Sequence, residues 1–178
     1  MHMVEKTVQR EVIYEGKIFN VEKHVVELPN GGTSVRELVY HNGAVAVLVI
    51  DEDDRIVLVE QYRKAFESMS LEIPAGKLEK GEEVLASARR ELEEETGYTA
   101  ETLEKIFSFY GAPGFCSERV DVFVAHGLTA GAMNLDEDEF LNVERFTFEE
   151  ASELLASGRI TDAKTIMAIQ WWQLSKLK

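Results

Sequence analysis

Residues 76–98 read GKLEKGEEVLASARRELEEETGY, and this stretch decides how the chain is interpreted. At about 100° per residue, its acidic residues Glu91, Glu94 and Glu95 fall within about 100° of arc on one helix. An apolar stripe is centred about 80° from them and consists of Val84, Leu85, Ala88 and Leu92. The three carboxylates are therefore expected at the edge of the buried core, partly shielded from water.

Grouping like charges in this way has a cost that a cation would remove. Each like-charged pair at i,i+4 destabilises an exposed helix by roughly 0.2–0.5 kcal/mol. Carboxylate oxygens select a hard divalent cation, Mg²⁺ or Mn²⁺, rather than zinc. No His/Cys cluster competes, because Cys116 is the single cysteine and the histidines are scattered, at His2, His24, His41 and His126. A Glu-rich helix is more often a solvated face, so these residues alone leave both interpretations open.

The chain ahead of this stretch is rich in β-branched and aromatic residues. Three strands are predicted there, at 7–14, 19–28 and 34–40. Turn signals at Gly16 and at Asn30-Gly31 separate them, and the second favours a hairpin. The continuous apolar run 44–50 predicts a strand buried on both faces, and 56–61 predicts a second buried strand.

Behind the quoted stretch, further strands are predicted at 106–110, 120–125 and 140–146. Thr147 with Glu150 forms a capping box for a short helix that ends near Gly158. Apolar residues at helical spacing predict a last helix over 161–177. The fold class is therefore mixed α/β, in the sense of α+β. A mixed central sheet is flanked by helices, with an N-terminal antiparallel β segment over 1–42 and the main domain over 43–178.

Charge, hydropathy and cysteine content exclude several classes of function. A formal net charge of −14 argues against a nucleic-acid partner, because Lys and Arg must neutralise phosphates. A small phosphorylated substrate stays compatible, since a bound metal can invert the local charge. No apolar run reaches the length of about eighteen residues that a membrane span needs, and residues 1–10 lack the apolar stretch of a secretory signal. With one cysteine, a reducing, cytoplasmic location is expected.

Taken together, the fixed positions of the quoted stretch resemble the Nudix box. They are Gly76, Glu82, Arg90-Glu91-Leu92, Glu94-Glu95 and Gly97-Tyr98, at the spacing of that box. Tyr98 stands at a packing position where an aliphatic residue is more usual. The chain is thus similar to the Nudix hydrolase superfamily, which implies a Nudix fold and metal-dependent cleavage of a nucleoside diphosphate linked to another group.

The resemblance implies a role for each position. Metal ligands would be the side chains of Glu91, Glu94 and Glu95 and the backbone carbonyl of Ala75. They would hold two or three Mg²⁺ ions, with Mn²⁺ as a substitute. Glu82 and Arg90 would order the loop and the helix, although Glu82 could equally be a favourable carboxylate in the first helical turn. Gly76 and Gly97 would serve backbone turns that a Cβ would strain.

Substrate choice in this superfamily lies outside the box. Pro113 follows Tyr98 at the spacing of the ADP-ribose pyrophosphatase subfamily, although it could be a simple turn proline. Residues 114–119 resemble a loop of that subfamily, in which Ser117 and Glu118 would hydrogen-bond the terminal ribose. Arg63 lies in a segment similar to one that approaches the pyrophosphate, with a surface ion pair as the alternative. The runs 158–165 and 170–172 also resemble the subfamily's C-terminal helix.

The N-terminal strands have a particular meaning in that subfamily. There they exchange between the two subunits of a homodimer and help to form the adenine site. The resemblance therefore implies that Tyr14, Phe19 and Arg36 contact the base, although each could instead be a core or surface residue. A β segment too small to bury its own face also favours a homodimer.

The implied reaction converts ADP-ribose and water into AMP and ribose 5-phosphate. The acidic loop 134–140 resembles the loop that closes over the metals, although its carboxylates would suit an ordinary solvated loop. Glu137 would be the general base and Glu139 a further metal ligand or alternative base, and Glu95 completes the catalytic set. Rival substrates are GDP-mannose or another nucleoside diphosphate sugar, and a dinucleoside polyphosphate. A rival of another class is a non-catalytic ADP-ribose-binding module, against which the complete box weighs.

Overall fold

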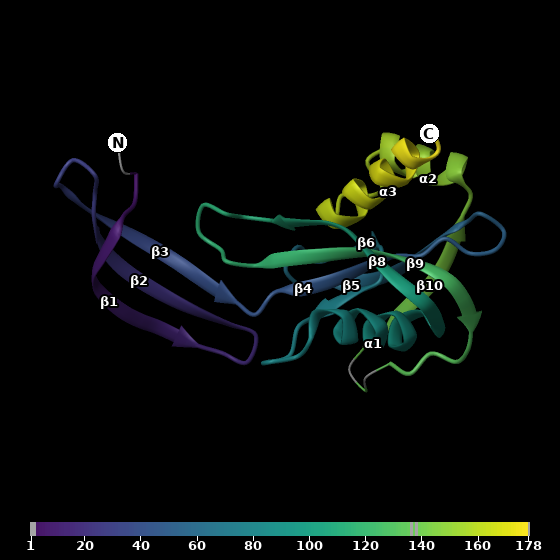
Figure 1. Ribbon diagram of the computed structural model, residues 1–178, viewed down its shortest axis with the longest axis horizontal. Coiled ribbons are helices and arrows are strands. Elements are labelled where there is room, and N and C mark those ends of the chain that lie inside the picture. The colour runs from purple at the N-terminus through teal and green to yellow at the C-terminus, as the bar shows by residue number, and fades with distance from the viewer. Residues whose placement is uncertain (1–2, 136, 138, 178) are drawn as a thin grey trace. The chain divides into compact units, whose positions relative to one another are not determined.

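The structure, a computed structural model, describes residues 3–135, 137 and 139–177 (Figure 1). The chain divides into two units. The first comprises Met1–Gly43 and Phe109–Arg119, and the second comprises Ala44–Ser108 and Val120–Lys178. The boundary expected after residue 42 falls beside Gly43, and the segment Phe109–Arg119 groups with the N-terminal strands.

Three antiparallel strands form the sheet of the first unit. They are β1 (Lys6–Glu15), β2 (Phe19–Glu27) and β3 (Thr33–His41), in the order β1-β2-β3. The turn between β2 and β3 falls at the Asn-Gly signal, where Gly31 has a φ of +82°. The segment 109–119 attaches to β3, because the Val39 N–H donates to the Phe115 carbonyl at 2.8 Å and the Ser117 N–H donates to the Val39 carbonyl at 2.9 Å.

The strands of the second unit form two sheets. One contains β4 (Ala44–Leu48), β7 (Ala75–Lys77), β8 (Tyr98–Tyr110) and β9 (Arg119–Ala130), in the order β7-β4-β9-β8. The other contains β5 (Ile56–Arg63), β6 (Ser68–Glu72) and β10 (Leu141–Phe146), in the order β10-β5-β6. β4 runs parallel to β9 and antiparallel to β7, so the sheet is mixed. The apolar runs 45–49 and 56–59 are fully buried, as their uninterrupted sequence predicts.

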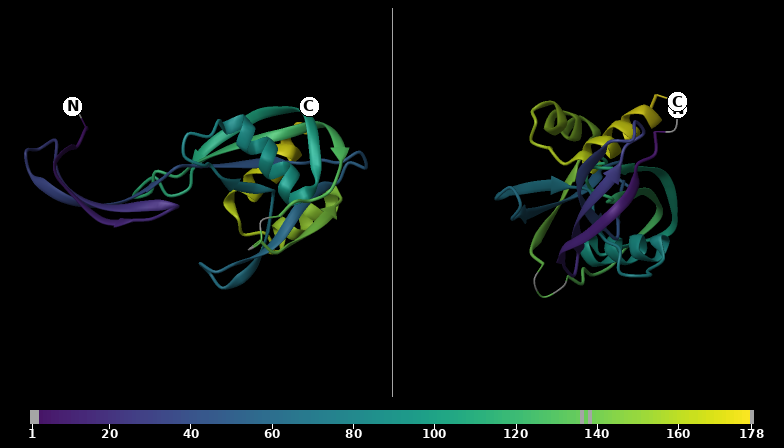
Figure 2. Two further views of the ribbon diagram at one scale, coloured as in Figure 1. Left: turned by 90° about the horizontal axis from the view of Figure 1, so that it is seen from below. Right: turned by 90° about the vertical axis from the view of Figure 1, so that its left-hand side faces the viewer.

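Helices cover the strands of this unit on two sides (Figures 1 and 2). α1 (Val84–Thr96) lies on one side and packs Ala88 and Leu92 into the core with the valines of β4. α2 (Phe148–Ala156) and α3 (Ala163–Ser175) lie on the other, where the rings of Phe148 and Trp172 meet edge to face at 5.1 Å. The predicted capping box at Thr147 is present. The expected mixed sheet flanked by helices is therefore confirmed.

Three strands differ from the prediction. β8 begins at Tyr98 rather than at residue 106. The prediction missed the first half of this strand because that half is partly exposed and carries mostly polar side chains. β6 and β7 were not predicted, since β6 lacks the continuous apolar run that marks β4 and β7 has only three residues. In the described part of the chain, no helix is both long and apolar enough to cross a membrane.

Candidate active site

Two caps fix where α1 begins and ends. The Glu83 carboxylate accepts a hydrogen bond from the Ala86 N–H at 3.0 Å. At the other end Gly97 is left-handed, with a φ of +72°, and its N–H donates to the Glu93 carbonyl at 2.8 Å. A Cβ on Gly97 would also lie 2.9 Å from the Gly131 carbonyl oxygen. Gly97 thus makes the turn that ends α1, and its missing side chain leaves room for the segment 131–133.

The C-terminal end of α1 also holds the start of the acidic loop. The Gly131 N–H donates to the Gly97 carbonyl at 2.7 Å, and the Asn134 N–H donates to the Glu94 carbonyl at 3.1 Å. The loop therefore starts beside the last turn of the helix. Within it, Glu137 and Glu139 are exposed, whereas Asp136 and Asp138 lie outside the described residues.

The backbone of β7 lies against two carboxylates of α1. The Ala75 N–H donates to Oε2 of Glu95 at 2.9 Å. Gly76 lies so close to Glu91 that a Cβ on Gly76 would overlap the Glu91 carboxyl group. Gly76 lies in a strand and does not have a positive φ, so a strained turn is not the reason for a glycine there. Gly76 instead leaves room for the Glu91 carboxylate.

These two carboxylates are buried and resist ionisation. Glu91 is 8% exposed and Glu95 is 3% exposed. Burial, together with the charges of Glu91 and Glu139, raises the pKa of Glu95 to about 8, despite the hydrogen bond that the carboxylate accepts. Burial also raises the pKa of Glu91, and Glu139 adds to the effect. The charge of Glu139 therefore acts on both side chains, and a positive charge near them would favour their ionised forms.

Arg90 joins the loop ahead of α1 to the helix. Its Nε and Nη2 donate to the Glu82 carboxylate at 3.0 and 3.2 Å. Its Nη1 donates at 2.8 Å both to Glu91 and to Glu94. The hydrogen bond from Arg90 lowers the pKa of Glu82 to about 2. Because Glu82 precedes the helix and the first turn holds no acidic residue, the alternative role for Glu82 in that turn is ruled out.

The chemistry of this donor set fits a hard divalent cation. Across residues 3–135, 137 and 139–177, no three His, Cys, Asp or Glu side chains are arranged to hold an ion. The three expected ligands on α1 have other partners instead: Arg90 for Glu91 and Glu94, and the Ala75 N–H for Glu95. The expected ligand atoms are carboxylate and carbonyl oxygens, and such ligands suit Mg²⁺ or Mn²⁺ rather than zinc.

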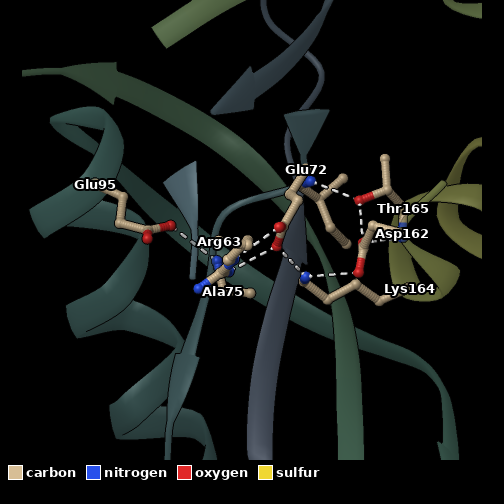
Figure 3. A network of polar contacts seen from close by, with 8 residues as sticks. Arg63, Glu72, Ala75, Glu95, Asp162, Lys164 and Thr165 are labelled. Atoms are coloured by element: carbon tan, nitrogen blue, oxygen red, sulfur yellow. Dashed lines mark hydrogen bonds and ion pairs between the residues drawn. The ribbon is translucent and has the colours of Figure 1, made fainter. Parts of the chain in front are cut away.

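Arg63, the last residue of β5, lies within electrostatic reach of this site. Its positive charge offsets a small part of the rise in the pKa of Glu95. Its Nε and Nη2 donate to the two carboxylate oxygens of Glu72 at 2.8 and 2.7 Å (Figure 3). The ion pair considered as the alternative role for Arg63 is present, but its acid is buried, with 3% of Glu72 exposed.

The residues expected at the adenine lie in the first unit. The rings of Tyr14 and Phe19 are exposed, and their centroids are 5.8 Å apart. Arg36 pairs with Glu5, to which its Nε donates at 2.9 Å. The two rings are therefore brought together, while the guanidinium has a partner of its own.

The residues expected at the terminal ribose also lie in the first unit, close to His41. The Ser117 hydroxyl accepts a hydrogen bond from the His41 N–H at 3.0 Å, and the Glu118 carboxylate lies 3.7 Å from Nδ1 of His41. Ser117 borders a cavity of about 350 Å³. Its other walls include Tyr40, Tyr110, Pro113 and Phe115. Pro113 thus borders a cavity in addition to making a turn.

Two charged residues near Arg63 received no role from the sequence. They are Glu72 and Lys164, and Lys164 donates a hydrogen bond to Glu72. The sequence does contain one local signal for a buried Glu72, because this charged residue stands between the apolar residues Leu71 and Ile73. Its partner Lys164 lies 92 positions along the chain, so the signal did not identify that partner.

Comparison with known proteins agrees with this geometry. The NUDIX domain family matches residues 40–169, and the nucleoside diphosphate sugar hydrolase N-terminal domain matches residues 5–39. The chain is 51% identical to an ADP-ribose pyrophosphatase of Bacillus subtilis (strain 168) and 49% identical to a methanol dehydrogenase activator of Bacillus methanolicus. Each alignment covers 97% of this chain and 94% of the relative. A crystal structure described as an ADP compounds hydrolase is similar with a TM-score of 0.84 at 26% identity, over 97% of this chain and 95% of that one.

Proposed function

This chain belongs to the NUDIX domain family, and we propose that it is a hydrolase that converts ADP-ribose and water into AMP and ribose 5-phosphate. The observation that carries the proposal is the pair of buried carboxylates, Glu91 and Glu95, held against the backbone of Ala75 and Gly76. The relative named for ADP-ribose supports the choice of substrate. Burying two carboxylates costs free energy, which a bound cation would offset. Acids with raised pKa values in such a place often belong to a functional site.

The cofactor in this proposal is Mg²⁺, with Mn²⁺ as a substitute and two or three ions per site. Glu91, Glu94 and Glu95 would hold it with the carbonyl of Ala75, and Glu139 would add a further carboxylate. When bound, such an ion polarises the diphosphate and lowers the pKa of an attacking water. The raised pKa of Glu95 supports the assignment, because a cation would restore the ionised form.

The protein's own groups do the remaining work. Arg63 binds and orients the diphosphate through its N–H groups. Glu137 takes the proton of the attacking water, a role that contributes roughly 10²–10⁴ in rate. Oxygen then bonds to phosphorus while the bridging P–O bond breaks, and two phosphomonoesters leave. The start of the loop beside the end of α1, and the effect of the Glu139 charge on Glu91 and Glu95, support a place for this loop near the site.

Replacing Glu137 or Glu139 by Gln should lower turnover of ADP-ribose at least tenfold while leaving the melting temperature unchanged. The reason is that an amide cannot accept the proton and binds a divalent cation weakly. Steady-state turnover and thermal unfolding measure both effects. Glu149→Gln, an exposed carboxylate at the start of α2, is the control and should turn over normally. Near-normal turnover in both loop variants would remove the loop from the mechanism.

Recognition of the two ends of ADP-ribose is assigned to the first unit. Tyr14 and Phe19 would stack on adenine, and Arg36 would add polar contacts. The two adjacent exposed rings support this, since stacking needs accessible faces. Ser117 and Glu118 would hydrogen-bond the terminal ribose. Their hydroxyl and carboxylate suit the hydroxyl groups of a sugar.

A homodimer is the expected assembly. β1 is exposed along its whole length, and Val8, Val12 and Ile13 are 55%, 47% and 56% exposed. A three-stranded sheet with apolar side chains this open gains stability when a second copy covers it. Light scattering at micromolar protein should give twice the monomer mass of 20.1 kDa. A monomer at that concentration would contradict the assembly. The cytoplasm is the expected compartment, because the chain has a single cysteine.

One experiment tests the function as a whole. Phosphate release is measured, through a coupling phosphatase, from ADP-ribose, GDP-mannose and a diadenosine polyphosphate, each with Mg²⁺, Mn²⁺ or EDTA. The proposal expects the highest kcat/KM for ADP-ribose with Mg²⁺ and none in EDTA. Faster cleavage of another substrate would change the proposed substrate to that nucleotide. Tight binding of ADP-ribose without cleavage would make the protein a binding module instead.

A further inference from the structure

Glu72, at the end of β6, is a buried carboxylate with cations on two sides. Only 3% of its surface is exposed, and the hydrogen bonds and charges of Arg63 and Lys164 hold it ionised. Arg63 approaches from β5 and Lys164 from the first turn of α3 (Figure 3). A carboxylate buried this deeply is stable only with such partners, so Arg63 and Lys164 both determine how Glu72 is held.

The way Glu72 binds Arg63 leaves one edge of the guanidinium open. Glu72 takes up Nε and one hydrogen of Nη2, so the other hydrogen of Nη2 and one hydrogen of Nη1 lie together on a different edge. Two parallel N–H groups on that edge match the spacing of two phosphate oxygens. The Arg63 side chain is 35% exposed, although the carboxylate that holds it is buried. The carboxylate thus holds one edge and directs the other outward.

The α3 side of the network fixes the carboxylate itself. Lys164 also pairs with Asp162 at 3.1 Å, and Asp162 caps α3 by accepting the Thr165 N–H at 3.0 Å. The Thr165 hydroxyl accepts the Ile73 N–H at 2.8 Å and donates to Asp162 at 2.6 Å. Two chains of contacts therefore join the N-terminus of α3 to the residues at the end of β6. A carboxylate fixed from both sides holds its arginine with little freedom.

We infer that Glu72 and Lys164 are positioning residues, which orient the open edge of Arg63 toward the diphosphate of the substrate. This inference rests on the proposed function, because it assigns Arg63 to the substrate. It gives a role to the segment around Asp162 and Lys164. Glu72 keeps its contacts with both cations while the open edge of Arg63 engages the ligand.

Two single variants test the positioning. Glu72→Gln should weaken ADP-ribose binding about tenfold in EDTA, measured by titration calorimetry, and lower kcat/KM with Mg²⁺ by a similar factor. Lys164→Met should act in the same direction by about threefold. Glu60→Gln is the matched control, because Glu60 also links β5 to the C-terminal segment, through Arg159, without touching Arg63. It should leave both measurements unchanged.

A double-mutant cycle separates positioning from a general structural effect. In an Arg63→Ala background, Glu72→Gln should change kcat/KM less than twofold, because no guanidinium is left to orient. A tenfold effect in both backgrounds would mean that Glu72 only supports the fold, and would overturn the inference.

Arg63→Lys provides a test that does not depend on how Glu72→Gln folds. Lysine can pair with Glu72, yet it offers no second edge, so ADP-ribose binding should weaken at least tenfold. Unchanged binding by Arg63→Lys would overturn the inference and leave the hydrolase assignment standing. A wild-type protein that binds ADP-ribose through Arg63 but cleaves nothing would overturn the proposed function and leave the positioning in place.

Discussion

Glu95→Gln is expected to lower turnover roughly 10³-fold and, in metal-free protein at pH 8, to raise the melting temperature. The loss of activity follows from removing one of the proposed charged ligands in a buried site, where electrostatic stabilisation has its largest effect. The gain in stability follows from burial, since an amide at a 3% exposed position carries no charge to desolvate. Both effects are measurable on one preparation, by steady-state kinetics with Mg²⁺ and by thermal unfolding in EDTA.

The pH dependence of that stability has a defined sign. The folded pKa of Glu95, about 8, lies above the ordinary value of 4.5. Below pH 4.5 the carboxyl is protonated in both states, so burial carries no ionisation cost. Between 4.5 and about 8 the unfolded chain releases the proton and the folded site retains it. The free energy of unfolding of the metal-free wild type should therefore fall by several kcal/mol as pH rises through this window. The Gln variant should lose less.

Magnesium should reverse the order of the two proteins. A cation at the site favours the ionised carboxylate, so Mg²⁺ should stabilise the wild type more at pH 8 than at pH 6 and stabilise Glu95→Gln weakly. Glu93→Gln is the matched control, because Glu93 lies on the exposed face of the same helix. A Glu95→Gln protein less stable than the wild type in EDTA at pH 8 would show that Glu95 is a structural acid.

The sequence predicted what is local and periodic. The 3.6-residue period of α1 and its left-handed Gly97 are short-range features, and both are present in the structure. The valines of β4 and β5 were predicted to be buried because an uninterrupted apolar run has no solvent-facing alternative. The tight turn at Gly31 was predicted from the neighbouring pair Asn30-Gly31, which is also a local signal.

The sequence did not predict contacts between distant charges. Lys164 reaches Glu72 across 92 positions, and no local pattern connects them. Arg90 was predicted to order the loop and helix, but its simultaneous contact with Glu82, Glu91 and Glu94 depends on how the loop folds over the helix. The glycine at 76 was predicted for its backbone freedom, whereas the structure requires it for the space that the Glu91 carboxyl group fills.

That reason for Gly76 leads to a second large expected effect. Gly76→Ala should lower kcat/KM by 10²-fold or more while changing the free energy of unfolding by no more than about 1 kcal/mol. The new Cβ overlaps only the end of the Glu91 side chain, which can rotate away, and an extended backbone tolerates alanine. The carboxylate therefore moves and the fold stays. Mn²⁺ affinity by calorimetry, kinetics with Mg²⁺ and thermal unfolding give the three measurements.

Gly81→Ala, in the loop between β7 and α1, is expected to do the opposite. Gly81 has a φ of +84°, and a Cβ there would meet nothing within 4 Å. Alanine in that conformation costs about 1–2 kcal/mol of stability, but no carboxylate is displaced, so turnover should stay normal. Two glycine-to-alanine changes five positions apart thus separate backbone strain from displacement of a ligand. If Gly76→Ala bound Mn²⁺ and turned over like the wild type, Glu91 could not be holding the cation from its position beside β7, and the arrangement of the site would have to be abandoned.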